Sequence, residues 1–253
     1  MSISKNELKK ISSLNRKSKR KEHGLFIVEG EKNCKELIES NYEVVVILAT
    51  SKVVSLFPGA IECSKKELER ISNLKNTSDV IAVSKIPKDL NYENDDKPII
   101  YLDNINDPGN LGSIIRSLDW FGFKHVFCSD NTVDQYNNKT IMASMGSIFR
   151  IQAHYINYQD FRKKFSKYTL FISSINGNNI EEIQLKKKAI MVIGSESNGV
   201  SDEIKNDNHQ AVKIPGMGKA ESLNAGVATG IILHEMVKKL TFESKWKCPN
   251  FWS

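Results

Sequence analysis

Along the second half of the chain, short apolar runs alternate with longer stretches of mixed polarity. The apolar runs predict buried strands at 99–102, 125–128, 170–173, 189–193 and 211–214. Helices are predicted at 112–121, 138–145, 159–165 and 222–239. Strand and helix alternating at this rhythm indicate an α/β domain with a parallel sheet that helices cover on both faces.

The first ninety residues show a shorter version of the same alternation. Strands are predicted at 25–28, 44–48 and 80–83, and helices at 4–14, 31–40 and 65–71. A polar, acidic stretch bounded by proline, 87–97, then separates the two halves as a linker. We therefore expect a small α/β domain at 1–94 and a larger domain at 95–253.

Composition narrows the classes of protein to consider. The chain has 253 residues and no run of about 18 apolar residues, the length needed to cross a membrane. Its first ten residues, MSISKNELKK, include no apolar signal segment. The four cysteines form no CxxC pair and the five histidines are dispersed. These features predict a cytoplasmic protein without membrane association, disulfide framework or metal site.

The net charge of +6 is unevenly distributed. Between Lys5 and Lys21 there are eight lysine and arginine residues and one acidic residue, Glu7. Such a basic run suits a polyphosphate backbone, and a solvated helix face is an equally good explanation from charge alone.

Three polar, glycine-bearing loops follow predicted strands, at 104–116, 193–199 and 214–224. The carboxyl ends of parallel strands meet at one edge of a sheet, and open α/β sheets bind ligands there. In the first loop, Gly112 and Ser113 are predicted to begin a helix that carries Arg116 on its first turn. An arginine at that position would meet a phosphate or a developing oxyanion.

Each loop also has a simpler explanation. Arg116 can also be explained as a solvated side chain, Glu196 as a turn acceptor, and Ser222 and Asn224 as helix caps. A dinucleotide site at Gly216–Gly218 is rejected. Glu221 replaces the third small residue of G-x-G-x-x-G, and too little chain follows for the rest of that fold.

The three loops carry a family resemblance. The segments NINDPGNLGSIIRSLDWFGF, MVIGSESNGVSDEI and VKIPGMGKAESLNAGVATGIILHE resemble, in order and spacing, motifs 1, 2 and 3 of the SpoU (TrmH-like) family of RNA ribose 2′-O-methyltransferases in the SPOUT superfamily. The resemblance covers about residues 97–240. The segment RKSKRKEHGLFIVEGEKNCKELIES is similar, more weakly, to the family's L30e-like substrate-binding domain. In motif 3, Gly216 occupies the usual methionine position and Met217 follows it, which is expected to alter the loop's contact with the cofactor.

The resemblance implies a parallel-sheet domain with a C-terminal trefoil knot, preceded by a small L30e-like α/β domain. It implies S-adenosylmethionine as the cofactor, held between the three loops without a metal. The residues implied to bind it are Gly194, Ile214, Met217, Gly218 and Leu223. It also implies a homodimer through the knotted domain, in which the partner's motif 1 completes the site.

The implied reaction is in-line transfer of the sulfonium methyl group to a ribose 2′-hydroxyl. The residues that match catalytic and polar motif positions are Asn110, Arg116, Glu196, Ser222 and Asn224. Arg116 is expected to grip a phosphate and stabilise the emerging alkoxide rather than act as a base, because a guanidinium is always protonated. Glu196 and Asn224 are expected to orient Arg116 and the ribose.

The implied substrate is structured RNA, with ribosomal RNA preferred and transfer RNA as the alternative. The basic run supplies the residues expected to contact it, which are Arg16, Lys17, Lys19, Arg20 and Lys21. A second alternative is a non-catalytic RNA-binding dimer, which calorimetry with S-adenosylmethionine would distinguish.

Overall fold

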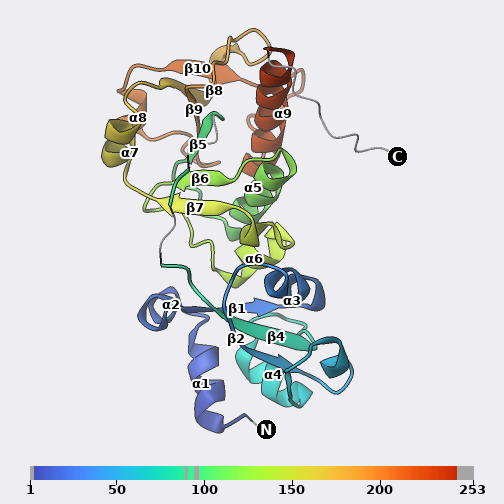
Figure 1. The fold of residues 1–253 in the computed structure, drawn as a ribbon. Helices are drawn as coiled ribbons and strands as arrows, with labels where there is room; N and C mark the ends of the chain where they lie inside the picture. The colour runs from blue at the N-terminus through green and yellow to red at the C-terminus, as the bar shows by residue number, and fades with distance from the viewer. Residues whose placement is uncertain (1–2, 89–90, 94–96, 244–253) are drawn as a thin grey trace. The chain divides into compact units, whose positions relative to one another are not determined.

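A computed structural model describes residues 3–88, 91–93 and 97–243, and the chain forms two compact units (Figure 1). Unit 1 comprises Met1–Leu90 and Asp134–Arg150, and unit 2 comprises Asn91–Val133 and Ile151–Ser253. The division expected from sequence has one boundary, between residues 94 and 95, whereas segment 134–150 packs with the first unit. Periodicity predicted a helix in that segment but carries no information on which unit the helix packs against. The functional division into 1–94 and 95–253 stays a prediction.

Unit 1 is built on a four-stranded sheet in the order β1-β4-β2-β3. Its strands are β1 (Leu25–Glu29), β2 (Val44–Ala49), β3 (Ile61–Glu62) and β4 (Val80–Lys85). Its helices are α1 (Lys5–Ser13), α2 (Lys17–His23), α3 (Glu31–Ile38), α4 (Lys65–Ile71) and α6 (Asn138–Ser144), with 3-10 turns at Val54–Leu56 and Ser147–Phe149. β4 runs antiparallel to β1 and β2, and β2 runs parallel to β3.

Helices α1 and α4 pack on one face of this sheet through an apolar cluster. Leu8 and Ile11 of α1 meet Leu68 and Ile71 of α4 over the strands. Both helices begin with a capping box, in which a serine accepts from the third backbone N–H and a glutamate bonds back to the serine N–H. The ends of α1 and α4 are joined by Asn15, whose side-chain amide donates to the Ile71 carbonyl at 2.7 Å.

Unit 2 is built on a six-stranded parallel sheet in the order β10-β8-β9-β5-β6-β7. Its strands are β5 (Ile99–Leu102), β6 (His125–Cys128), β7 (Gln152–Tyr155), β8 (Thr169–Asn179), β9 (Ala189–Ile193) and β10 (Gln210–Lys213). Its helices are α5 (Pro108–Trp120), α7 (Tyr158–Lys164), α8 (Asp202–Lys205) and α9 (Ala225–Glu243). The predicted α/β fold with a parallel sheet is confirmed.

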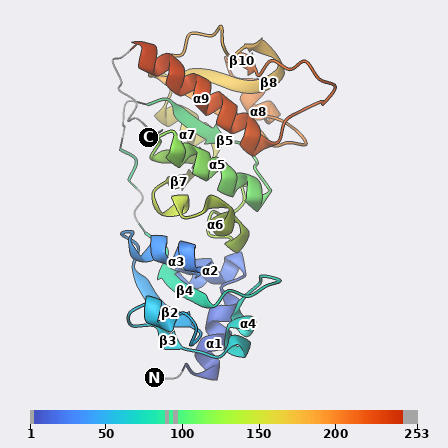
Figure 2. The ribbon, with the colours of Figure 1, turned by 90° about the vertical axis from the view of Figure 1, so that its right-hand side faces the viewer.

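Two pairs of helices cover the faces of this sheet. Helices α5 and α9 lie side by side on one face, and α7 and α8 lie on the other (Figures 1 and 2). Under α7 and α8 the core is aromatic: Tyr101, Phe127, Phe161 and Phe165 are all buried there. Because helices cover both faces of the sheet, its inner strands contain uninterrupted runs of apolar residues, and this is why they could be predicted from sequence.

Two features of the sheet escaped the sequence analysis. β7 (Gln152–Tyr155) lies at the edge, and its residues mix polar and apolar types, so no apolar run marks it. β8 continues to Asn179, past the predicted end at residue 173. At Gly177 an added Cβ would lie 2.4 Å from the Ala211 carbonyl carbon, so only glycine allows β8 to follow β10 this closely.

No helix among the described residues is both long and apolar enough to cross a membrane. Within the same ranges, no three histidine, cysteine, aspartate or glutamate side chains gather as a metal-ion site. The aromatic stretch at 245–253, whose role the sequence leaves open, lies outside the described residues.

Candidate functional site

The carboxyl end of the unit 2 sheet is organised by buried polar groups directly after β5. Asp103 is 3% exposed and accepts a hydrogen bond from the Ser201 backbone N–H at 2.7 Å. Its second oxygen accepts from the side-chain amide of Asn104 at 2.8 Å. Asn104 has a φ of 56°, a left-handed conformation that asparagine tolerates better than most residues. These contacts tie the loop after β5 to the loop after β9.

The loop after β9 folds back on itself into a tight turn. The backbones of Ser195 and Gly199 exchange two hydrogen bonds, of 3.1 and 2.9 Å. An added Cβ at Gly194 would lie 2.2 Å from the Gly199 carbonyl carbon, so glycine is required for this closure. The turn holds Glu196 at its tip, exposed to solvent.

Three segments that are far apart in the chain converge on Glu196. Its Oε1 accepts from the Asn110 amide at 2.7 Å, from the Asn224 amide at 2.8 Å and from the Ala225 backbone N–H at 3.1 Å. The Asn224 amide also donates to Asn110 Oδ1 at 2.8 Å. One carboxylate oxygen therefore joins the loops after β5, β9 and β10, as the three motifs predicted.

Asn110 is positioned by the start of α5, which differs from the predicted start. Asp107 is the N-cap, its side chain accepts from the Asn110 N–H at 2.8 Å, and Pro108 is the first helical residue. Aspartate at the N-cap followed by proline is a helix start signal, and it places the start four residues before the predicted start at Gly112. The prediction that Arg116 lies on the first turn is therefore wrong.

Arg116 lies six residues beyond Asn110 on α5, displaced by about 9 Å along the helix axis and on a different face. Its side chain is exposed and makes no hydrogen bond or ion pair with any residue in the described ranges. Within one chain, Arg116 does not meet the cluster of Asn110, Glu196 and Asn224. The expectation that Glu196 and Asn224 orient Arg116 is not met by contacts within a single chain.

The loop between β10 and α9 is open to solvent. Ile214, directly after β10, is partly buried, whereas Gly216, Met217 and Gly218 are exposed. An added Cβ at either glycine would have no neighbour within 4 Å. The end of the loop therefore presents backbone and apolar groups, including the exposed side chain of Leu223, to the same edge of the sheet.

Ser222 is exposed two residues before Asn224, and its hydroxyl has no hydrogen-bond partner among the described residues. The three predicted polar residues that come together are thus Asn110, Glu196 and Asn224, with Ser222 beside them in the chain.

Helix α9 is held close to α5 just after this cluster. Ala225 and Gly226 are buried, as expected for small residues on a packed helix face. A Cβ on Gly226 would lie 2.2 Å from Ser113 Oγ, so the two helices touch where Gly226 has no side chain. The position of Asn224 is therefore fixed by helix packing as well as by hydrogen bonds.

Thiol chemistry is disfavoured at this edge of the sheet. Cys128 ends β6 and is fully buried, and burial raises the pKa of its thiol well above the usual range. The cluster itself consists of amides, backbone N–H groups and one carboxylate. Such a set can position a substrate and its partners but carries no positive charge of its own.

The basic residues expected to contact RNA have unequal surroundings. Arg16, Lys17 and Lys21 are exposed, and Lys19 forms an ion pair with Glu22 at 2.6 Å. Arg20 is 4% exposed, so its prediction as an RNA contact is corrected. Sequence charge alone could not distinguish it from its exposed neighbours.

Arg20 serves as an internal anchor of unit 1. Its guanidinium donates to Asp134 Oδ2 at 2.6 and 2.9 Å and to the carbonyl oxygens of Leu14 and Asn15 at 2.8 and 3.0 Å. It thereby fixes the end of α1 to the start of segment 134–150.

One residue that organises the site was missed by the sequence analysis. Asp103 follows the apolar strand β5 directly, and an acidic residue at a strand end is a signal that the sequence does contain. Its burial and its bond to the Ser201 N–H depend on a loop almost a hundred residues away, which no local pattern shows.

Two family models match the chain. The model of the SpoU rRNA Methylase family matches residues 97–234, and the model of the MRM3-like substrate binding domain matches residues 5–82. The two matched ranges follow one another in the order expected from the sequence.

Two relatives illustrate the similarity in sequence. The 23S rRNA (guanosine(2553)-2′-O)-methyltransferase RlmP of Bacillus subtilis (strain 168) is 26% identical over 91% of this chain and 95% of its own length. An uncharacterised tRNA/rRNA methyltransferase of Archaeoglobus fulgidus is 35% identical, over 56% of this chain and 64% of its own length.

Solved structures show the same arrangement of elements. A putative RNA methyltransferase of the TrmH family from Porphyromonas gingivalis aligns with a TM-score of 0.84 at 28% identity, covering 93% of this chain and 98% of that one. An rRNA methyltransferase from Sinorhizobium meliloti with AdoMet bound aligns with a TM-score of 0.82 at 26% identity, covering 95% and 97%.

Proposed function

Since the chain belongs to the SpoU rRNA methylase family, we propose that it transfers a methyl group from S-adenosylmethionine to a ribose 2′-hydroxyl of RNA. The observation that carries the proposal is the convergence of Asn110, Asn224 and the Ala225 N–H on one oxygen of Glu196. Residues from all three motifs meet there, and a 2′-hydroxyl distinguishes RNA from DNA.

The cofactor site that we propose is the edge formed by Gly194, Ile214, Met217, Gly218 and Leu223. The residues fit such a ligand because the backbone around Gly216 and Gly218 is unobstructed and the Leu223 side chain is 45% exposed beside it. Backbone N–H and C=O groups can hydrogen-bond an adenine edge, and an apolar side chain can cover its ring. The S. meliloti relative holds AdoMet, which supports this assignment.

The cofactor supplies an activated methyl group, and the protein's own residues supply position and charge. Arg116 binds the phosphate next to the target ribose and stabilises the negative charge that develops on the 2′-oxygen. Its guanidinium stays protonated, so it is a donor and not the base, and the 2′-hydroxyl proton leaves to solvent water as the oxygen–methyl bond forms and the sulfur–methyl bond breaks. Asn110, Glu196 and Asn224 hold the three loops together, and the exposed Ser222, two residues before Asn224, is a further polar group.

We propose that the protein acts as a homodimer in which Arg116 reaches the cluster of the partner. Within one chain Arg116 makes no hydrogen bond or ion pair with Glu196, and a second copy could bring the two together. Helices α5 and α9 carry large exposed apolar side chains, with Trp120 at 71%, Val227 at 53% and Ile231 at 38% exposure. A two-fold interface along these helices would cover them and use the same surface on both subunits.

We also propose that the C-terminal part of unit 2 forms the trefoil knot expected from the resemblance. After β10 the chain reaches the Glu196 turn, where the Ala225 N–H bonds to the carboxylate, and then packs against α5 as α9. True knots are rare, so limited proteolysis that leaves α9 attached to the folded domain under native conditions would support threading.

Ribosomal RNA is the substrate that we propose, with transfer RNA as the alternative. RlmP, whose length is covered almost completely, is a 23S rRNA enzyme by name, and other relatives are named tRNA/rRNA methyltransferases. Mapping 2′-O-methyl groups on total RNA with and without the gene tests this. Loss of a mark from ribosomal RNA is expected, and loss from transfer RNA alone would contradict it.

Calorimetry and methyl transfer test the proposed activity. The wild-type protein is expected to bind S-adenosylmethionine, and Arg116→Ala is expected to abolish transfer while its cofactor Kd stays within a few-fold. Arg116 stabilises the transition state and does not hold the cofactor, so the transfer rate should fall while the affinity for the cofactor is nearly unchanged. No binding at millimolar cofactor would instead favour the non-catalytic RNA-binding protein.

A further inference from the structure

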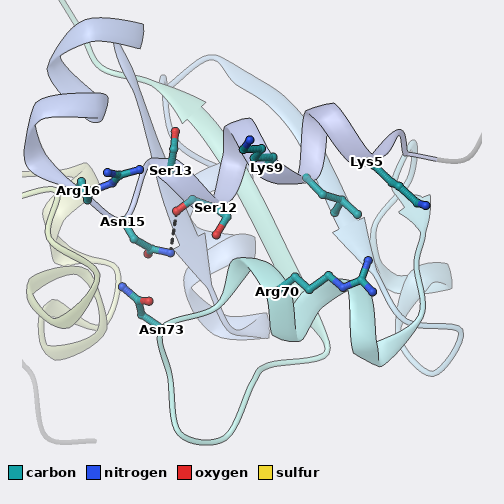
Figure 3. Close-up of a pocket in the computed structure, with 9 residues that line it drawn as sticks. Lys5, Lys9, Ser12, Ser13, Asn15, Arg16, Arg70 and Asn73 are labelled. Atoms are coloured by element: carbon teal, nitrogen blue, oxygen red, sulfur yellow. Dashed lines mark hydrogen bonds between the residues drawn. The ribbon is translucent and has the colours of Figure 1, made fainter.

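A groove in unit 1 runs between α1 and the end of α4 (Figure 3). It encloses about 620 Å³ and is lined by nine residues, none of them acidic. Helix α1 supplies one wall, with Lys5, Lys9 and Ser12, and Arg70 and Asn73 supply the other. From these walls we infer that the groove holds the sugar–phosphate backbone of one strand of the RNA substrate.

The charge of the lining residues is positive. Lys5, Lys9, Arg16 and Arg70 line the groove, and none of the four forms an ion pair with an acidic group of the described residues. Hydrogen bonds from Ser64, and to a smaller extent the positive charge of Arg70, lower the pKa of the neighbouring Glu67 carboxyl. Lys5 and Lys9 are four residues apart on α1, where like charges cost about 0.2–0.5 kcal/mol in a helix. Lys5 is also the first residue of α1, where the helix dipole disfavours a cation. A polyanion in the groove removes both unfavourable terms.

The neutral lining residues suit ribose rather than bases. The Ser12 hydroxyl and the Asn73 amide make no side-chain hydrogen bond with the described residues, so both can bond to a 2′-hydroxyl. The lining has no aromatic side chain on which a base could stack. Recognition is therefore of the backbone and largely independent of base sequence.

The groove is preformed. The Asn15 amide donates to the Ser12 carbonyl at 3.2 Å and to the Ile71 carbonyl at 2.7 Å, which holds the two walls together at one end. Rigid walls reduce the ordering cost of binding. Asn15 is a positioning residue, and the cations around it make the contacts.

This assignment changes the surface expected from sequence. Of the five residues predicted to contact RNA only Arg16 lines the groove. Lys5 and Lys9 belong to the same basic run but were not among the five. Arg70 comes from α4, almost fifty residues beyond the basic run, so its proximity depends on the fold.

The test measures binding of the full-length protein to a 12-nucleotide oligouridylate by fluorescence anisotropy over a series of salt concentrations. The groove variant is Lys9→Gln with Arg70→Gln. The matched control is Lys10→Gln with Lys66→Gln, which removes one exposed lysine from each of the same two helices but none from the groove. All four positions are exposed, so both proteins should unfold like the wild type.

We expect the groove variant to raise the Kd about tenfold and to reduce the slope of log K against log salt by about 1.4, since each single-strand phosphate contact contributes about 0.7. The control should change the Kd by less than about threefold. Equal weakening in both variants, or an unchanged slope in the groove variant, would overturn the inference.

The inference rests on the proposed function, and the two can fail separately. A wild-type protein that binds the oligouridylate through the groove but does not bind S-adenosylmethionine would refute the methyltransferase proposal alone. Cofactor binding together with a groove variant that binds RNA like the wild type would refute the groove alone.

Discussion

At the residue scale, Arg20 shows why a run of charges does not define a binding surface. In the sequence, Arg20 cannot be distinguished from the seven other lysine and arginine residues of the basic run. In the structure its guanidinium is buried and makes four hydrogen bonds within unit 1. Arginine suits this position because its planar fork reaches a carboxylate and two carbonyl oxygens at once.

Replacing Arg20 should therefore affect folding and not RNA contacts directly. Arg20→Met is expected to lower the free energy of unfolding by about 3–5 kcal/mol, because Asp134 and two carbonyl oxygens lose their donor. Lys21→Met, an exposed neighbour, should cost less than about 0.5 kcal/mol. Urea unfolding followed by circular dichroism measures both. Similar small losses would mean that the buried pair contributes no net stability.

The sequence predicted which residues belong to the site, but it did not predict correctly which of them contact one another. Motif positions pointed to Asn110, Glu196 and Asn224, and these meet. Arg116 belongs to the same motif as Asn110, yet it lies on another face of α5 and faces solvent. Two residues of one motif were expected to lie close together in space. Six residues along a helix, however, Arg116 points in a different direction from Asn110.

At the element scale, boundaries depend on capping chemistry that periodicity overlooks. The strands β5, β6 and β9 begin and end as predicted because each is a continuous buried run. The helix α5 starts four residues before the predicted position because Asp107 caps it and Pro108 is its first residue. β7 was missed because an edge strand with polar residues carries no apolar signal.

The N-cap of α5 should couple stability to the cofactor site. Asp107→Ala is expected to cost about 1 kcal/mol and to weaken S-adenosylmethionine binding severalfold, because Asn110 loses the fixed first turn that points it at Glu196. Asn157→Ala removes the corresponding N-cap of α7, on the other face of the sheet. It should cost a similar amount without changing cofactor affinity. Thermal unfolding and calorimetry separate the two, and equal affinities in both variants would refute the coupling.

The contact between α5 and α9 gives a second prediction about elements. Gly226→Ala places a Cβ against Ser113 Oγ and should destabilise the protein by about 1–3 kcal/mol, as overpacking does. Gly230→Ala on the same helix meets Ser117 Oγ at 3.8 Å, an ordinary contact, and should be neutral or stabilising by up to about 1 kcal/mol. Adding Ser113→Ala should recover much of the Gly226→Ala loss. Denaturant midpoints measure all three, and a failed rescue would locate the strain elsewhere.

At the scale of the whole molecule, the sequence predicted one parallel α/β unit well and the partition of the chain less well. Segment 134–150 packs with the first unit although it lies between strands of the second. Contacts such as that between Asn138 and buried Glu29 join residues more than a hundred positions apart. Local patterns do not contain such information.

Subunit complementation tests the proposed dimeric site most directly. A mixed dimer of Arg116→Ala and Glu196→Ala chains, isolated through two different tags, has one site that lacks both residues and one that has both intact. If Arg116 acts in the partner's site, the mixed dimer should retain about half the wild-type rate per dimer, because a two-fold dimer has two equivalent sites. Each parent homodimer should be nearly inactive.

The opposite arrangement gives the opposite result. If Arg116 served the Glu196 cluster of its own chain, each site in the mixed dimer would lack one residue and the rate would match the inactive parents. S-adenosylmethionine binding by each mixed dimer, measured in parallel, confirms that the subunits are folded.

The exposed apolar residues Val227 and Ile231 test where the interface lies. Replacing both by lysine should dissociate the dimer and abolish transfer, because Arg116 would lose the cluster on which it acts.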